Sequence, residues 1–343
     1  MIAPDLYVPS EAGRSGGEAR WPGLARLARF GAASALPEGW RSTLARRLGA
    51  PHAAAASPAA VAAMAMAVDG LPIESSHPHW VWLADPVHLS AGLTTVHLAA
   101  RLRLDAVEQA ELSRDFASTF AGCGYGLAPT RCGRFLAAGP PMAGRAETPD
   151  PARWLGASLA DAIATRPAAE AFRRLGAEIE MWLHGHPLNV RRVRAGRLAV
   201  SALWLWGGGP PLAAPPLTGG HSPWVFFGDD PFMEGLAHLC GARRAPALHR
   251  LDALAPSDAE RVVIELELLA PPEPQSAGLA LDAPFAAEAL ERDWVAPALE
   301  RLDRRAVERI VLIAGDRQVA LARLDGLRFW RRRRDPLAAL SGR

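Results

Sequence analysis

The chain contains no lysine, so arginine supplies all 38 of its basic residues. This absence excludes a Schiff base, a lysine general base and the lysine of a phosphate-binding loop. Any acid–base chemistry must therefore come from the ten histidines and from the carboxylates.

Cysteine is also scarce. Cys123, Cys132 and Cys240 are odd in number and widely spaced, which fits reduced thiols rather than a disulfide framework and gives no zinc pattern. The sequence has no charged N-terminal start followed by an apolar core, and no run of about 18 apolar residues. These features predict a cytoplasmic protein that is not inserted in a membrane.

Net charge is small, at +2, which argues against a whole-molecule attraction to nucleic acid or to an anionic membrane. The main basic run is Arg331 to Arg334, beside Trp330. Contact with RNA or DNA is one interpretation of this run, and an exposed terminus is the other.

The chain has 343 residues, half of them hydrophobic, which is enough for one large α/β domain or two smaller ones. We expect a disordered tail over residues 1–20, an N-terminal α+β region over 21–150 and a C-terminal α/β region over 151–343. The border falls in the segment Gly139–Ala152, which is dense in proline, glycine and charge. An antiparallel meander is predicted near the end of the chain, from Ile310–Ala314, Gln318–Leu324 and Leu327–Trp330.

One stretch predicts a strand covered on both faces. Leu198 to Trp206 is almost wholly apolar over nine residues, and the run Gly207, Gly208 and Gly209 ends it. Ligands of open α/β sheets collect beyond the carboxyl ends of such strands, where bare glycine amides can approach an anion. The same glycine run is also typical of a simple turn.

A basic loop precedes this strand. It holds Arg191, Arg192, Arg194 and Arg197 beside His184, His186 and Asn189. Guanidinium groups suit carboxylate or phosphate, so the loop and the glycines predict an anion pocket formed by Asn189, Arg192, Arg197 and Gly207 to Gly209. A solvated loop is the alternative.

Two further places offer acid–base groups. Asp85 and His88 are expected in the loop after the strand His79–Leu83, where they could bind a metal or orient a base, although Asp85 before Pro86 is also an ordinary turn starter. Asp229 and Asp230, at the end of another predicted strand, are the best carboxylate pair in the sequence. A helix N-cap explains one of them without any function.

Four segments carry a resemblance to a known family: ADPVHL (84–89), EIEMWLHGHPLN (178–189), LWLWGGG (203–209) and FWRRRRDPL (329–337). Together they resemble the RpfE-type regulatory proteins of proteobacteria, over about residues 20–340. A second resemblance is to one portion of archaeal-type cofactor-independent phosphoglycerate mutases, which belong to the alkaline phosphatase superfamily. It is carried by HPLN, an arginine, a glycine–basic pair and WLWGGG. That second resemblance covers about residues 175–242.

The mutase pattern N-x-x-R-x-x-x-G is matched by Asn189, Arg192 and Gly196. Arg197 stands in place of its lysine, Ala199 in place of its proline and Ser201 in place of its asparagine. Enzymes of the superfamily resemble one another in a two-metal centre of Asp and His with an attacking Ser or Thr. This chain has neither an N-terminal Asp-Gly metal motif after a strand nor a later D-x-x-x-H pair, and phosphoryl transfer at neutral pH depends on such a centre.

We therefore expect an α/β protein with a mixed sheet, a buried central strand and flanking helices, alkaline-phosphatase-like in part, plus the C-terminal meander. The expected function is that of a mutase-like binding or regulatory protein without a cofactor, whose partner is a small anionic, phosphorylated ligand. One alternative is a phosphoglycerate mutase or phosphatase that uses Mn or Mg, with His88, Asp229, Asp230 and His184 or His186 brought together by folding. The other is a protein-interaction module with a protein partner.

Overall fold

The structure is a computed structural model that describes residues 1–3, 20–68, 80–92, 94–141, 148–160, 170–212, 222–254, 261–266, 283–327 and 330. Most of the predicted N-terminal tail, part of the predicted border at 139–152 and the arginine run at 331–334 lie outside these residues. Among the helices described, none is both long and apolar enough to cross a bilayer.

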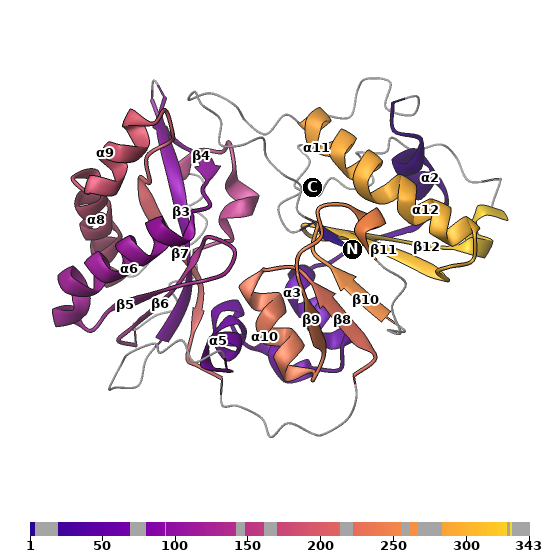
Figure 1. The fold of residues 1–343 in the computed structure, drawn as a ribbon, viewed down its shortest axis with the longest axis horizontal. Helices are drawn as coiled ribbons and strands as arrows, with labels where there is room; N and C mark the ends of the chain where they lie inside the picture. Colours follow the sequence, from indigo (N-terminus) through magenta and orange to yellow (C-terminus); the bar gives the residue numbers. More distant parts are fainter. Residues whose placement is uncertain are drawn as a thin grey trace.

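The middle of the chain folds into one antiparallel sheet, which we call, with its helices, the middle lobe (residues 80–209; left in Figure 1). Its strands are β3 (Trp80–Ala91), β4 (Val96–Arg101), β5 (Gly126–Pro129), β6 (Phe135–Gly139) and β7 (Ala202–Gly209). The long strand β3 lies at the centre. It pairs with β7 along one edge and with β6 and then β4 along the other.

Both faces of this sheet are covered by apolar side chains of helices. One face packs Trp82, Leu203 and Leu205 against α6 (Ala106–Phe120), α8 (Glu170–His184) and α9 (Pro187–Arg194). The other packs Leu83 and Trp206 against α5 (Pro58–Val68). The predicted covered strand is therefore present as β7, but β3 occupies the centre of the sheet.

Both ends of the chain combine into an outer lobe with two further sheets (right and bottom in Figure 1). The first has the order β1 (Ile2–Ala3), β11 (Arg309–Ala314), β12 (Arg317–Ala322) and β2 (Ala32–Ala35). The second is parallel, with the order β10 (Arg261–Ile264), β8 (Trp224–Phe227) and β9 (Arg243–Ala245). A parallel bridge between Ile2 and Glu265 links the two sheets.

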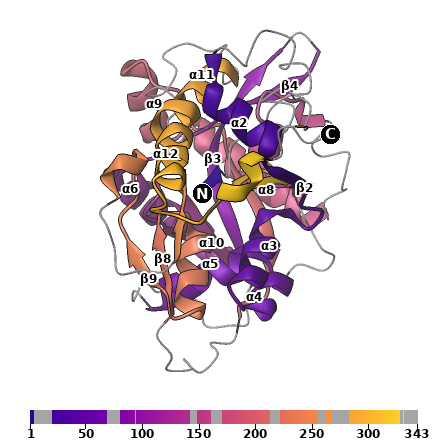
Figure 2. The same cartoon turned by 90° about the vertical axis from the view of Figure 1, so that its right-hand side faces the viewer.

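Helices pack around these sheets. The α-helices of the outer lobe besides α5 are α2 (Pro22–Phe30), α3 (Gly39–Arg47), α4 (Pro51–Ala55), α10 (Pro231–Leu239), α11 (Ala283–Leu290) and α12 (Ala296–Asp303). A π-helical turn, Glu291–Val295, joins α11 to α12. Single 3₁₀ turns are η1 (Ala121–Cys123), η2 (Pro151–Trp154), η3 (Leu251–Ala253) and η5 (Arg323–Leu327). Figure 2 shows α2, α11 and α12 above α3, α4, α5 and α10.

The mixed α/β class with flanking helices is confirmed, whereas several local predictions differ from the structure. The border predicted near residue 150 does not separate two sheets, because β7 pairs with β3 across it and the outer lobe takes strands from both ends. The strands β11 and β12 of the predicted meander are present, and β2 pairs with the other edge of β12. Residues 328–329 of the predicted third strand lie outside the described part of the chain. Residues Arg323–Leu327 form a 3₁₀ turn instead.

Two loop predictions were wrong for local reasons. Gly207 to Gly209 do not end the strand but belong to β7, with neighbours so close that larger residues would clash; a Cβ on Gly208 would lie 2.2 Å from the Trp82 ring. The basic segment after Gly185 is helix α9, in which Pro187 occupies the first turn and His186 is the N-cap. Proline at that position starts a helix as readily as it ends one.

The lobes meet where α5 packs on β3 and β7 of the middle lobe, and the backbone of α5 is in contact with that of α10. A Cβ on Gly235 of α10 would lie 1.8 Å from the carbonyl oxygen of Val61 in α5. Since α5 also packs on β3 and β7, this contact places α10 against the middle lobe.

Gly235→Ala is expected to destabilise the protein by about 1–3 kcal/mol, because the methyl group overlaps a backbone atom that cannot rotate away. Gly176→Ala is the matched control, since Gly176 is also helical and no atom lies within 4 Å of the added Cβ. That change should be neutral or should stabilise by about 0.5–1 kcal/mol. Urea unfolding measures both, and equal effects would contradict the close contact.

Candidate functional site

A buried carboxylate, Asp85, lies in the middle of β3 and is 1% exposed. The sequence predicted it in a loop because of Pro86. Proline is tolerated here because β6 pairs with β3 only as far as Ala84 and β4 pairs only from Val87. The missing N–H of Pro86 therefore coincides with a gap between two partner strands.

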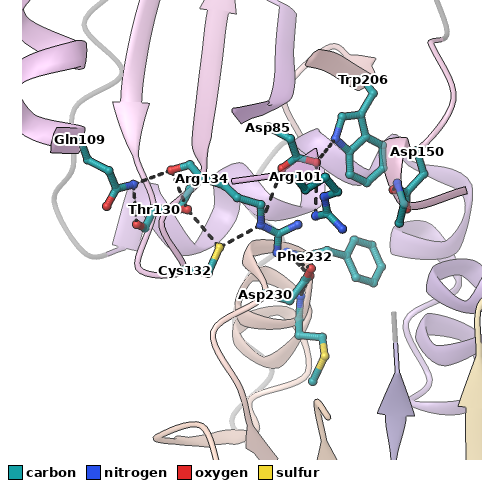
Figure 3. A network of polar contacts seen from close by, with 12 residues as sticks. Asp85, Arg101, Gln109, Thr130, Cys132, Arg134, Asp150, Trp206, Asp230 and Phe232 are labelled. Atoms are coloured by element: carbon teal, nitrogen blue, oxygen red, sulfur yellow. Dashed lines mark hydrogen bonds and ion pairs between the residues drawn. The ribbon is translucent and has the colours of Figure 1, made fainter. Parts of the chain in front are cut away.

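The same gap brings two arginines to Asp85 (Figure 3). Arg101 ends β4 and places its Nη2 3.3 Å from Oδ2 of Asp85, while Arg134 precedes β6 and places its Nε 3.7 Å from Oδ1. On the other edge of β3, the indole Nε1 of Trp206 donates a hydrogen bond of 2.9 Å to Oδ2. Asp85 thus sits where three strands converge.

Arg134 extends this network from the middle lobe to the outer lobe. Its Nη2 donates to Oδ2 of Asp230 at 2.8 Å. Asp230 is the N-cap of α10, and its Oδ1 accepts from the amides of Phe232 and Met233. All three charged side chains are buried, with Arg134 only 8% exposed. Removing one partner would leave an uncompensated buried charge, which is strongly destabilising.

The turn that carries Arg134 is held rigidly. The side-chain Nε2 of Gln109, on α6, donates to the carbonyl oxygens of Thr130 and Arg134 at 3.0 and 2.7 Å. Arg134 Nε also donates to Cys132 Sγ at 3.0 Å. Burial raises the pKa of the Cys132 thiol, so the sulfur acts here as a neutral acceptor.

A third tie between the lobes is made by Arg41 of α3. Its Nη1 is 2.7 Å from Oδ2 of Asp150. Its guanidinium carbon lies 4.3 Å from the ring centroid of Trp40 and 4.6 Å from that of Trp206. Stacking of this kind suits arginine and places α3 against β7.

Glu265 lies behind Asp230, at the carboxyl ends of the parallel strands β8 and β10. Its Oε2 accepts from the backbone amides of Asp229 and Asp230 at 2.9 and 2.8 Å. Gly228 permits this approach, because it has φ 147° and a Cβ there would lie 2.5 Å from Glu265 Oε2. In α/β sheets, this edge is where ligands most often bind.

The two neighbouring carboxyls titrate in opposite directions. Burial, and then the charge of Asp230, raise the pKa of Glu265 to about 7. Burial would also raise the pKa of Asp230, but the charges of Arg134 and Arg41 and its hydrogen bonds bring it below the ordinary value. Asp230 is therefore the anionic member of the pair, and Glu265 is the member that takes up a proton more readily.

Asn189, Arg192 and Arg197, which were predicted to form part of an anion pocket, bind other groups of the middle lobe. Nη1 of Arg192, which is 2% exposed, donates to both carboxylate oxygens of Glu108 at 2.9 Å. Arg197 Nη1 donates to the same carboxylate at 2.8 Å. The Asn189 side chain bonds the amide and carbonyl of Val200 and the carbonyl of Leu183. This cluster ties α9 to α6 and to the chain entering β7.

Gly207 to Gly209 lie at the opposite end of β7 from that cluster. A Cβ on Gly207 would meet Pro58, and one on Gly209 would meet Ser57, both at the start of α5. The cluster of Asn189 instead adjoins Val200, before the strand begins. The structure does not bring the two halves of the predicted pocket together.

The predicted histidines have separate positions. His88 Nδ1 lies 2.9 Å from the carbonyl oxygen of Ala199; because a carbonyl only accepts, this nitrogen carries the hydrogen. It therefore cannot deprotonate the nearby Ser201 hydroxyl. His186 Nδ1 accepts from the amide of Leu188, and His184 is exposed at the end of α8. Folding does not place these histidines beside Asp230.

Of the predicted carboxylates, Asp85 and Asp230 both take part in the network. Asp229 takes part through its backbone amide, which donates to Glu265. Sequence reasoning missed Arg101, Arg134 and Glu265. The sequence signal that could have indicated them is a charged residue at the edge of an apolar run. Examples are RFLAAG for Arg134 and RVVIEL for Glu265. Within the described part of the chain, no three His, Cys, Asp or Glu side chains are grouped so that they could hold a metal ion.

No family model and no curated protein matches the chain. Among solved structures, it is similar to a cofactor-independent phosphoglycerate mutase from Thermoplasma acidophilum, with 16% identity over 94% of this chain and 88% of that one and a TM-score of 0.36. It is also similar to a protein from Pyrococcus horikoshii, with 11% identity over 94% and 86% of the two chains and a TM-score of 0.43. Neither similarity is close enough to carry an argument about activity.

Glu265 makes stability depend on pH in a defined window. Since its folded-state pKa lies above the ordinary value of 4.5, its contribution to stability is complete below pH 4.5 and is lost as pH rises to about 7. The loss should be at most about 3 kcal/mol. Glu265→Gln is expected to remove this part of the pH dependence, as measured by urea unfolding at pH 5 and 8.

Glu288→Gln is the control, because Glu288 is exposed beside Arg20 and should leave the pH profile unchanged. A wild-type stability that is equal at pH 5 and 8 or higher at pH 8, with no difference in Glu265→Gln, would contradict a raised pKa at Glu265.

Proposed function

We propose that this chain is an RpfE-type, phosphoglycerate mutase-like protein that binds a small phosphorylated anion and acts through binding or regulation rather than catalysis. The observation that carries the proposal is the position of Arg134, which holds the carboxylates of both Asp85 and Asp230.

Phosphoryl transfer through two metals requires carboxylates that are available as metal ligands. Asp85 is engaged by Arg101, Arg134 and Trp206. Asp230 is engaged by Arg134 and by two amides of α10. A metal ion would have to displace a buried guanidinium from each, leaving that arginine unpaired in the interior.

The ligand class comes from the resemblance of residues 175–242 to the mutases and from the abundance of arginine, which binds phosphate well. The pocket expected from Asn189, Arg192, Arg197 and the glycines is not the favoured place for that ligand, because Glu108 already accepts from Arg192 and Arg197.

The second candidate function is a phosphoglycerate mutase or phosphatase dependent on Mn or Mg. It is favoured by the position of Asp229, Asp230 and Glu265 at the carboxyl ends of two parallel strands. A protein-interaction role is favoured by exposed apolar side chains on α6, α8 and α9, namely Val107, Met181, Val190 and Val193.

The discriminating experiment measures interconversion of 2- and 3-phosphoglycerate with added Mn or Mg, together with 3-phosphoglycerate binding in the presence of chelator. We expect no turnover and binding that persists with chelator. Metal-dependent turnover that disappears in Asp230→Asn but persists in Asp316→Asn, an exchange in a turn of the outer lobe, would establish the enzyme instead. Absence of both turnover and binding would contradict the ligand-binding proposal.

A further inference from the structure

The helix α9 exposes apolar side chains to solvent and buries polar ones. Its buried residues are Leu188, Asn189 and Arg192, whereas Val190 and Val193 are 46% and 61% exposed. Valine is a weak helix former, and an exposed valine removes little apolar surface from water. The stability of a single copy of the chain therefore does not account for valine at these two positions.

Two exposed arginines, Arg191 and Arg194, lie beside these valines on the surface of α9. Residues three or four apart are neighbours on a helix, so Arg194 lies next to Val190. Arg191 pairs with Glu111 of α6. Among the described residues, no carboxylate pairs with Arg194. A position near the helix C-terminus favours basic residues, but it does not explain why they alternate with valines.

The preceding helix, α8, exposes an apolar residue beside an acidic one. Ile179 belongs to its buried stripe, and Met181, two residues or about 200° further around the helix, is 70% exposed. Glu180 is exposed as well, and no cation of the described part of the chain pairs with it. Glu178, by contrast, pairs with Arg174 of the same helix at 2.9 Å.

These two helices make a surface that is complementary to itself. They follow each other in the chain and lie on the side of the middle lobe away from the outer lobe (Figure 1). We call this surface the α8–α9 patch, and its residues are Glu180, Met181, Val190, Val193 and Arg194. In a two-fold dimer the same patch serves on both subunits, so that α9 of one copy can face α8 of the other twice. The acidic half of the patch then meets the basic half, and the exposed apolar side chains cover one another.

We propose that the α8–α9 patch is the interface of a homodimer, in which Arg194 pairs with Glu180 of the partner subunit. This inference goes beyond the proposed ligand binding and does not rest on it. The helices have 15 and 8 residues, which at 1.5 Å per residue gives about 35 Å of helix on each subunit. Such a patch is at the low end of specific interfaces, below about 1,200 Å² in total, so the dimer should be weak and should depend on protein concentration.

Sedimentation velocity over a series of protein concentrations tests the apolar part of the interface. The wild type is expected to show a monomer–dimer equilibrium. Val193→Asp and Met181→Asp should each weaken the dimer by at least about 10-fold, because they bury an unpaired charge. Leu324→Asp is the matched control, since Leu324 is 64% exposed in the turn η5 of the outer lobe; this variant should dimerise as the wild type does.

An exchange of charges tests the pairing of the two subunits. At low salt, where screening is weak, Arg194→Glu and Glu180→Arg should each weaken the dimer by at least about 10-fold, because each places like charges opposite one another. The double variant restores opposite charges across the interface and should dimerise within about 3-fold of the wild type. A double variant that is weaker than either single one would overturn the proposed pairing, since the effects would then simply add.

Three further outcomes would overturn the homodimer. The first is a wild type that remains monomeric at every concentration. The second is a dimer that neither Val193→Asp nor Met181→Asp weakens, which would place the interface elsewhere. The third is a monomeric wild type that co-sediments with phosphatidylglycerol vesicles and loses this binding in Val193→Asp, because the α8–α9 patch would then bind an anionic membrane surface instead of a second copy.

Discussion

One buried guanidinium joins carboxylates of the two lobes. Arg134 lies between Asp85 of the middle lobe and Asp230 of the outer lobe, in a region where an unpaired charge would be expensive. The supporting contacts fix both sides of this interaction: Gln109 holds the turn that carries Arg134, and Glu265 holds the amide of Asp230. Apolar packing of α5 on β3 and β7 brings the lobes together, and the ion pair between Arg134 and Asp230 adds a polar contact between them.

Much of the local structure could be predicted because its cause is local. The capping box of Asp105 and Glu108 starts α6 as expected, and the order Asp230–Pro231 starts α10. Pairing could not be predicted in the same way. That β2 adjoins β12, or that β3 rather than β7 is central, depends on contacts between segments far apart in the sequence.

The candidate site shows the same division. Asp230 was found because an acidic residue before proline at a strand end is recognisable on its own. Arg134 and Glu265 lie beside apolar runs that predict strands, and their partner Asp230 is 96 and 35 residues away. The arginines of α9 were conspicuous in the sequence, yet Arg192 and Arg197 are bound by Glu108, more than 80 residues earlier. The dense arginine segment of α9 therefore serves contacts inside the middle lobe, whereas the isolated Arg134 makes the contact between the lobes.

Strands from the two ends of the chain pair in one sheet, and this pairing constrains the order of folding during synthesis. The middle lobe is contiguous, so its sheet can close once residues 80–209 have emerged from the ribosome. By contrast, Ile2 pairs with Ile313, and Ala33 with Val319, so the earliest strands wait for almost the whole chain. Pairings of such high separation are slow to form and leave strand edges exposed meanwhile. Nascent chains are thus expected to carry a finished middle lobe beside an unfinished outer lobe, and Asp230 reaches Arg134 only in the later stage.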